Sequence, residues 1–199
     1  MYNWGYNSCY GGEAHQKSDR RNPKIEHSTI NMIANYYKAG PATKEGIRSR
    51  IADPSSRNGD ADAGKWWVSE NFVAGSSSVT ADNLKGVTKT SSAYRLDKPW
   101  PAMPINQQTA QKAYLAVLGS AGCSSPKRDA IDKRIIEEVR TGTATMGKNG
   151  IISKPSDVGG WPELKSAVAP ADSDHDGMPD EWETAHGLDP SDKEDDNKT

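Results

Sequence analysis

The sequence contains little of what several protein classes depend on. Its 199 residues include only two cysteines, Cys9 and Cys123, which are too few for a disulfide framework and lack metal-ligand spacing; whether they pair is left open. No run of about 20 apolar residues is present, which argues against a membrane span, and the N-terminus lacks the basic and apolar regions of a signal peptide. With 34% hydrophobic residues and a mean hydropathy of −0.84, the composition predicts a soluble, loop-rich globular protein.

Charge is distributed unevenly along the chain. The formal net charge is −2, yet residues 172–199 carry 11 acidic and 2 basic side chains, whereas residues 1–171 carry 16 acidic and 23 basic ones. A basic body favours a polyanionic partner, and an acidic tail either remains solvated or collects hard cations. There is no glycine-rich phosphate loop and no basic face with helical spacing, so we expect no nucleic-acid binding.

Apolar residues in the first 75 positions occur in runs of strand length, at residues 2–10, 30–37 and 66–73. The second and third runs lie about 36 residues apart, and each is followed by a Gly-bearing turn. This spacing suits a parallel β-solenoid, in which each coil buries its apolar side against the next; a β-sandwich would give a similar pattern. The first run would leave an exposed sheet edge, so we expect the chain to begin inside a larger fold.

The middle of the chain changes character. Residues 76–107, which include a proline cluster, are predicted to form a long irregular connection. Thr109 is predicted to cap a first helix that ends near Gly119. Ser125, followed by a proline at the first helical position, is predicted to cap a second helix that ends near Gly142. Each helix carries one apolar stripe and should therefore pack on the flank or end of the stacked strands.

The strongest chemical motif lies in the acidic tail. Residues 172–183 match the calcium-loop pattern D-x-D-x-D-G-x5-E at every specified position. Calcium takes about six to eight oxygen ligands, which alternate carboxylates in a tight loop can supply, while the glycine permits the sharp bend. The predicted ligands are Asp172, Asp174, Asp176, the backbone carbonyl of Met178, Asp180 directly or through water, and Glu183 as a bidentate closure. The alternative interpretation is an acidic, solvated tail.

The surroundings of this motif predict an isolated loop. Upstream prolines exclude a full helix before it, whereas residues 181–186, stopped by Gly187, allow one or two helical turns after it. We therefore expect a structural calcium ion of weak, extracellular-type affinity. Residues 189–196 could start a second loop, but the chain ends before completing one. An intracellular calcium sensor is an alternative that the single loop disfavours.

Other candidate residues give weaker signals. The histidines at positions 15, 27, 175 and 186 are scattered, and none has an evident ligand or nucleophile partner, so surface positions are expected. The basic stretch 17–24 could bind anions, although such loops are commonly solvated. Aromatic side chains in the strand runs could stack on sugar rings, but they more often pack inside the fold. These aromatics are Tyr36, Tyr37, Trp66 and Trp67.

Several segments resemble the later coils of secreted bacterial pectate lyases, which fold as a right-handed parallel β-helix. The first two are Tyr2–Glu13, which reads YNWGYNSCYGGE, and Asn31–Thr43, which reads NMIANYYKAGPAT. Ser125–Asp132, Val158–Pro162 and Asp172–Glu183 follow in the order found in the C-terminal part of this family. The last segment resembles EF-hand-like and thrombospondin type 3-like calcium loops. The resemblance covers most of the chain.

The resemblance implies a mainly β fold in three parts. Residues 1–107 would form late coils of the β-helix with a wrapping loop, residues 108–165 a helical segment packed on them, and residues 166–199 an acidic calcium-binding tail. The implied activity is calcium-dependent β-elimination of polygalacturonate (pectate), an acidic polysaccharide, by a secreted, extracellular enzyme. In such enzymes calcium bridges substrate and protein carboxylates. An arginine, its pKa lowered by burial and cationic neighbours, takes the C5 proton.

The chain departs from the family at the catalytic region. In the family, an arginine–proline motif and the acidic catalytic calcium ligands precede the segment that Tyr2–Glu13 resembles. The stretch Arg20–Lys24, RRNPK, is similar to that motif but follows the segment, which disfavours Arg21 as the base. The catalytic residues are therefore unknown, and the loop at residues 172–183 is not the family's catalytic metal site. We expect the sequence to be N-terminally incomplete, with the upstream part of the same β-helix preceding Met1. The rival hypothesis is a non-catalytic, calcium-binding carbohydrate-binding or cell-surface module.

Overall fold

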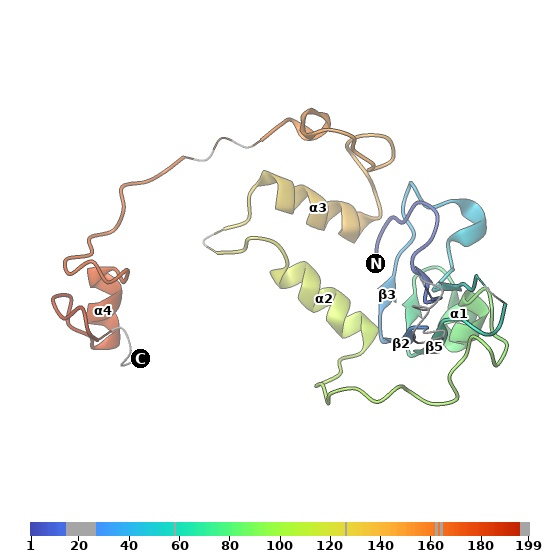
Figure 1. Ribbon diagram of the computed structural model, residues 1–199. Coiled ribbons are helices and arrows are strands. Elements are labelled where there is room, and N and C mark those ends of the chain that lie inside the picture. Colours follow the sequence, from blue (N-terminus) through green and yellow to red (C-terminus); the bar gives the residue numbers. More distant parts are fainter. Residues whose placement is uncertain (15–26, 58, 126, 162, 164, 196–199) are drawn as a thin grey trace, which may run out of the picture. The chain divides into compact units, whose positions relative to one another are not determined.

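The computed structural model describes residues 1–14, 27–57, 59–125, 127–161, 163 and 165–195. The chain divides into two compact units, Met1–Val158 and Gly159–Thr199 (Figure 1). The three-part division at residues 107 and 165 stays a prediction. The basic stretch 17–24, with Arg21, lies outside the described residues.

Short strands of the N-terminal unit pair in parallel. β1 (Tyr10–Gly11) pairs with β4 (Asp53–Pro54), β2 (Thr29–Ile33) with β5 (Lys65–Ser69), and β3 (Tyr36–Tyr37) with β6 (Phe72–Val73); β2 and β5 lie side by side in Figure 1. In the last two pairs each residue lies opposite the residue 36 positions later, as Ile30 lies opposite Trp66 and Tyr37 opposite Val73. The second and third apolar runs therefore pair at the offset that the sequence indicates. A parallel β-helix remains a prediction.

Each of these two runs bends once. The first run therefore forms two strands, β2 and β3, and the second forms β5 and β6. Ala34 and Glu70, which separate the strands, have left-handed backbone φ angles of 52° and 59°. This conformation is unfavourable for residues with a Cβ atom. Asn71, the residue after the second bend, stabilises both corners because its Nδ2 donates to the carbonyls of Met32 at 2.8 Å and Ser69 at 3.0 Å.

The core of this unit is aromatic and aliphatic. Trp4 and Tyr37 meet edge to face with ring centroids 6.2 Å apart, and the indole Nε1 of Trp4 donates to the carbonyl of Ile47 at 3.3 Å. Ile47 belongs to a 3₁₀ helix, η1 (Glu45–Ile47). Tyr37 is only 1% exposed, so its ring belongs to the core rather than to a binding surface, and burial raises the pKa of its hydroxyl. The buried cluster contains Trp4, Tyr37, Ile47, Ile51, Ala52, Trp66, Val73 and Val79.

The prediction that residues 76–107 are irregular is wrong in part. They contain α1 (Ser77–Ala81) and a 3₁₀ helix, η2 (Asn83–Gly86), and isolated parallel bridges join Ala52 to Val87 and Trp66 to Arg95. Apolar periodicity does not reveal these elements, because polar side chains fix them. The hydroxyl of Thr80, for example, accepts a hydrogen bond from the backbone N–H of Val73 at 3.0 Å.

Two longer helices follow, α2 (Ala110–Ser120) and α3 (Ala130–Thr141). Thr109 caps α2 as predicted, because its side chain accepts from the N–H of Lys112 at 3.3 Å. Gly142, in the left-handed conformation with φ 80°, ends α3, which confirms the predicted end of that helix.

The predicted start of α3 is wrong. Asp129, not Ser125, is its N-cap, and the Asp129 carboxylate accepts from the N–H of Asp132 at 2.8 Å. Arg128, directly before the cap, is tied to the end of α2. Arg128 donates to the carbonyls of Ala121 at 2.8 Å and Leu118 at 3.1 Å.

Both helices are joined to β3 or to the residue that follows it. The ring of Tyr114 on α2 stacks on Tyr36 with centroids 4.1 Å apart, and Tyr36 stacks on Phe72 at 4.9 Å. The ammonium of Lys38 donates to the carbonyls of Val139 and Arg140, each at 2.8 Å. A cation at a helix C-terminus is favourable because unpaired carbonyls concentrate there. The predicted packing on the strands is confirmed for α2, which meets β3 through Tyr114; for the apolar stripe of α3 it stays a prediction.

Candidate functional site

The acidic motif forms a loop that leads into a short helix of the C-terminal unit. The turn passes through His175 and Gly177, with φ angles of 62° and 99°, and α4 (Asp180–His186) follows. Gly187, with φ 78°, ends α4, which confirms the helical turns and the stop that the sequence predicts. The chain then turns back, and the N–H of Leu188 donates to the carbonyl of Glu183 at 2.9 Å.

Five carboxylates gather around this loop and helix. Oxygens of Asp172, Asp174 and Asp176 lie within 4.8 Å of one another, and so do oxygens of Asp176, Glu183 and Asp195. Because Asp176 belongs to both groups, the five side chains form a single cluster, called the carboxylate cluster below. Glu183 is fully buried, and Asp195 is only 3% exposed.

The four aspartates of the carboxylate cluster share one arrangement. One oxygen of each accepts a backbone N–H: Asp172 from Gly177 at 3.2 Å, Asp174 from Asp176 at 3.2 Å, Asp176 from Met178 at 2.7 Å, and Asp195 from Asp189 at 2.8 Å. The other oxygen of each is buried and has no hydrogen-bond partner, and neither has either oxygen of Glu183. Six buried carboxylate oxygens therefore have no donor.

This arrangement is electrostatically unfavourable without a cation. Burial, followed by the charges of Asp174, Asp176, Asp195 and Asp180, raises the pKa of Glu183 to about 7. Burial also raises the pKa of Asp174, as do the neighbouring Asp176 and Asp172. A hard divalent cation would remove the repulsion. A set made only of oxygens fits calcium or magnesium better than zinc or copper, which favour nitrogen and sulfur ligands.

The structure does not bring all the predicted ligands together. Asp172, Asp174, Asp176 and Glu183 meet in the carboxylate cluster, although their role as ligands stays a prediction. Asp180 is engaged elsewhere, since its two oxygens accept from the backbone N–H and the hydroxyl of Ser173, both at 2.8 Å. The backbone N–H of Met178 donates to Asp176, and the role of its carbonyl as a ligand stays a prediction.

Asp195 is the cluster member that the sequence analysis did not assign. The sequence predicts that residues 189–196 could start a second loop, whereas Asp195 joins the first one. The signal that could have identified it is Gly187, which ends α4 in the left-handed conformation and so reverses the chain toward the loop.

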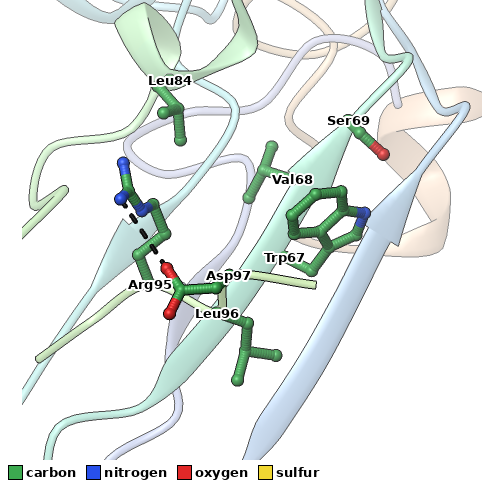
Figure 2. A pocket seen from close by; sticks show the side chains of 7 residues that line it. All are labelled: Trp67, Val68, Ser69, Leu84, Arg95, Leu96 and Asp97. Carbon is green, nitrogen blue, oxygen red and sulfur yellow. Dashed lines mark ion pairs between the residues drawn. The ribbon is translucent and has the colours of Figure 1, made fainter. Parts of the chain in front are cut away.

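A second candidate region is a pocket of about 220 Å³ beside β5 (Figure 2). Trp67 and Val68 come from β5, Leu84 comes from η2, and Arg95 and Asp97 form an ion pair with N–O separation 3.8 Å. Both charged side chains are largely exposed, so the pair contributes little to stability. The pocket is smaller than a typical small-molecule site of about 300 Å³ or more, and we assign it no role.

The remaining candidates have structural positions. Trp66 and Tyr37 are buried in the core, and Tyr36 stacks between Phe72 and Tyr114. Cys9 and Cys123 are free. Among the helices of the described ranges, none is long and apolar enough to cross a membrane.

The chain was compared with family models and with curated proteins. No family model matches the chain. Curated proteins named "probable pectate lyase C" are similar to it: that of Aspergillus terreus is 29% identical over 204 residues, that of Aspergillus fumigatus 31% over 195 residues, and that of Aspergillus flavus 28% over 200 residues. Each comparison covers 96% of the chain and 41% of the relative, so the chain spans less than half the length of these proteins. They are fungal, and a bacterial source stays a prediction.

Proposed function

We propose that this chain is part of a pectate lyase-like polysaccharide lyase and that the complete enzyme acts outside the cell on polygalacturonate. The observation that carries the proposal is the similarity of 96% of the chain to several fungal proteins named "probable pectate lyase C". The fold supports it, because strand pairs that repeat after 36 residues suit the stacked coils of a parallel β-helix. We propose that residues 1–107 form such coils.

The proposed reaction is a β-elimination on a uronic acid unit. A base removes the proton from C5, the bond from C4 to the glycosidic oxygen breaks, and a C4–C5 double bond forms while the departing sugar oxygen gains a proton. Calcium bound to the substrate carboxylate would make the C5 proton more acidic. The excess of basic residues in positions 1–171 would attract the polyanion. We assign the base to no residue of this chain.

A chimaera tests the proposal. The chain would replace the segment that it matches in the Aspergillus fumigatus relative, and unsaturated uronides released from polygalacturonate in calcium would be followed by ultraviolet absorbance. We expect the chimaera to release them, as the intact relative does, whereas the relative without that segment does not. A chimaera that unfolds cooperatively yet releases no product, beside an active intact relative, would contradict the proposal.

The chain by itself is expected to release no unsaturated uronides. In the family that it resembles, the arginine base precedes the segment similar to Tyr2–Glu13. Sustained product formation by the chain alone would show that the base lies within it. Calcium-dependent retention of the chain on polygalacturonate, combined with an inactive chimaera, would favour the rival function of a non-catalytic carbohydrate-binding module.

A further inference from the structure

The C-terminal unit has no apolar core within the part that the structure describes. Of its described residues 159–161, 163 and 165–195, only Glu183 and Asp195 are buried. Trp161 is 86% exposed and Val168 97% exposed, while Met178 and Leu188 are only half-buried. Hydrophobic burial, the usual source of stability for a compact unit, is therefore largely missing. Small units of this kind commonly depend on a metal or a cross-link.

We propose that one calcium ion takes the place of this core. Its ligands are the five side chains of the carboxylate cluster, Asp172, Asp174, Asp176, Glu183 and Asp195, and its binding folds the loop, α4 and residues 188–195 into one unit. This inference goes beyond the proposed function and does not depend on it, because it concerns a structural ion and not the reaction.

The unpartnered oxygens match one ion in number. Four aspartates each present one such oxygen and Glu183 presents two, which gives the six ligands at the lower limit of calcium coordination. Magnesium requires near-ideal octahedral geometry and retains several waters, so a site of six protein oxygens favours calcium.

The separations within each group are short enough for a shared ion. Two oxygens bound to the same calcium at about 2.4 Å can be no more than about 5 Å apart. Within each of the two groups of carboxylates the oxygens lie within 4.8 Å of one another, and both groups contain Asp176. The ion of this proposal therefore lies next to Asp176, the residue common to both groups.

Asp195 gives this site a ligand from beyond the loop motif. It lies 12 residues after Glu183, and its second oxygen is held by the N–H of Asp189, so its unpartnered oxygen is fixed in position. Asp180, at the ninth position of the motif, is held by Ser173 instead. The ion would thus connect chain segments on both sides of α4. Without it, five carboxylates would repel one another with no apolar core to oppose them.

Calorimetric titration of the full chain with calcium chloride tests the ligand set. We expect one calcium per chain and much weaker binding of magnesium chloride. Asp195→Ala should weaken calcium binding at least about tenfold, because it removes a ligand. The matched control Glu194→Ala removes the same charge from the exposed neighbouring residue and should change the affinity less than about threefold, as should Asp180→Asn. Equal effects of Asp195→Ala and Glu194→Ala, or two calcium ions per chain, would overturn the proposal.

Hydrogen exchange tests the coupling to folding. The backbone amides of Gly177 and Asp189 donate to cluster carboxylates, and we expect chelator to abolish their protection. Amides of the N-terminal unit, such as that of Trp66, which donates to the carbonyl of Tyr94 at 2.9 Å, should remain protected and show that this unit stays folded. Unchanged protection of Gly177 and Asp189 in chelator would refute the coupling, whatever the result of the lyase assays.

Discussion

Asn71, between β5 and β6, lies beside Asn35, which occupies the equivalent position between β2 and β3. The side-chain oxygen of Asn71 accepts hydrogen bonds from the backbone N–H of Asn35 at 2.9 Å and from the Nδ2 of Asn35 at 3.0 Å. The backbone N–H of Asn71 in turn donates to the side-chain oxygen of Asn83 at 2.7 Å. Asn71 is 1% exposed. Asn71 thus connects the bend after β2, the bend after β5 and the start of η2.

Replacing this amide should strongly destabilise the N-terminal unit. Asn71→Ala removes the acceptor of the part-buried N–H of Asn35 and one donor each from the carbonyls of Met32 and Ser69, of which Ser69 keeps the N–H of Ala34. Each buried group left without a partner costs about 1–3 kcal/mol. We expect the free energy of unfolding in urea to fall by about 3 kcal/mol or more. The control is Asn31→Ala, which removes two exposed hydrogen bonds to Trp100 and should cost less than about 1 kcal/mol. Similar losses for both variants would refute the role of the buried amide.

The close approach of Gly12 and Gly64 predicts a site where no side chain fits. A Cβ atom on Gly64 would lie 2.5 Å from the Cα of Gly12, which is backbone and cannot rotate away. We expect Gly64→Ala to lower the free energy of unfolding by about 2 kcal/mol or more. Gly46→Ala is the matched control, since a Cβ there meets nothing within 4 Å. It should be neutral or stabilising by up to about 1 kcal/mol. Thermal melts of both variants would decide, and a Gly64→Ala variant as stable as the original would contradict the packing.

Glu138 predicts an acid-dependent contribution to stability. Burial opposes its ionisation, but hydrogen bonds from Thr145 and Arg134 and the charge of Arg134 together lower the pKa of this carboxyl. Arg134 Nη1 lies 3.0 Å from each carboxylate oxygen, and the N–H of Thr145 lies 2.9 Å from Oε1. Because the folded pKa is below the unfolded value of about 4.3, the stabilisation is complete above that pH and is lost as pH falls through the folded pKa.

Urea unfolding of the original chain and of Glu138→Gln at several pH values tests this sign. The original should be more stable by about 2 kcal/mol near neutral pH, and the difference should shrink as pH falls below about 4. Glu137→Gln, at an exposed residue paired with Arg140, should change stability by less than about 1 kcal/mol. A difference for Glu138→Gln that grows in acid would reverse the assignment.

The ring of Tyr114 is expected to hold α2 against β3. The ring stacks on Tyr36, and the hydroxyl donates to the carbonyl of Val139 at 3.3 Å. Tyr114→Ala should destabilise the N-terminal unit by about 3 kcal/mol because it leaves a cavity between α2 and β3. Tyr114→Phe keeps the ring and should cost less than about 1 kcal/mol. Equal losses in urea unfolding would show that the hydroxyl, not the stack, holds the helix.

The parts of the fold that follow from apolar spacing could be predicted from the sequence. The runs around Ile30 and Trp66 pair at their sequence offset, and α2 begins at the cap that Thr109 provides. The bends at Ala34 and Glu70 could not be predicted, because neither residue favours a left-handed backbone. They depend on hydrogen bonds from Asn71, a residue that reads as polar in the sequence but lies in the core.

The candidate site shows the same division. Four carboxylates of the motif meet as their spacing requires, since a short loop fixes their relative positions. Asp195 belongs to the carboxylate cluster, with its second oxygen held by the backbone of Asp189, whereas both oxygens of Asp180 accept from Ser173. The ligand role of Asp180 stays a prediction. A loop pattern includes neither contact, and Asp195 reaches the carboxylate cluster only after the chain reverses at Gly187.

The connections that lead into β2 and β5 differ in length, yet these two strands pair without a break. Residues 12–28 connect β1 to β2, whereas the shorter stretch 55–64 connects β4 to β5, and β2 still pairs with β5 residue by residue. Chain length at this position is therefore decoupled from the alignment of the layers.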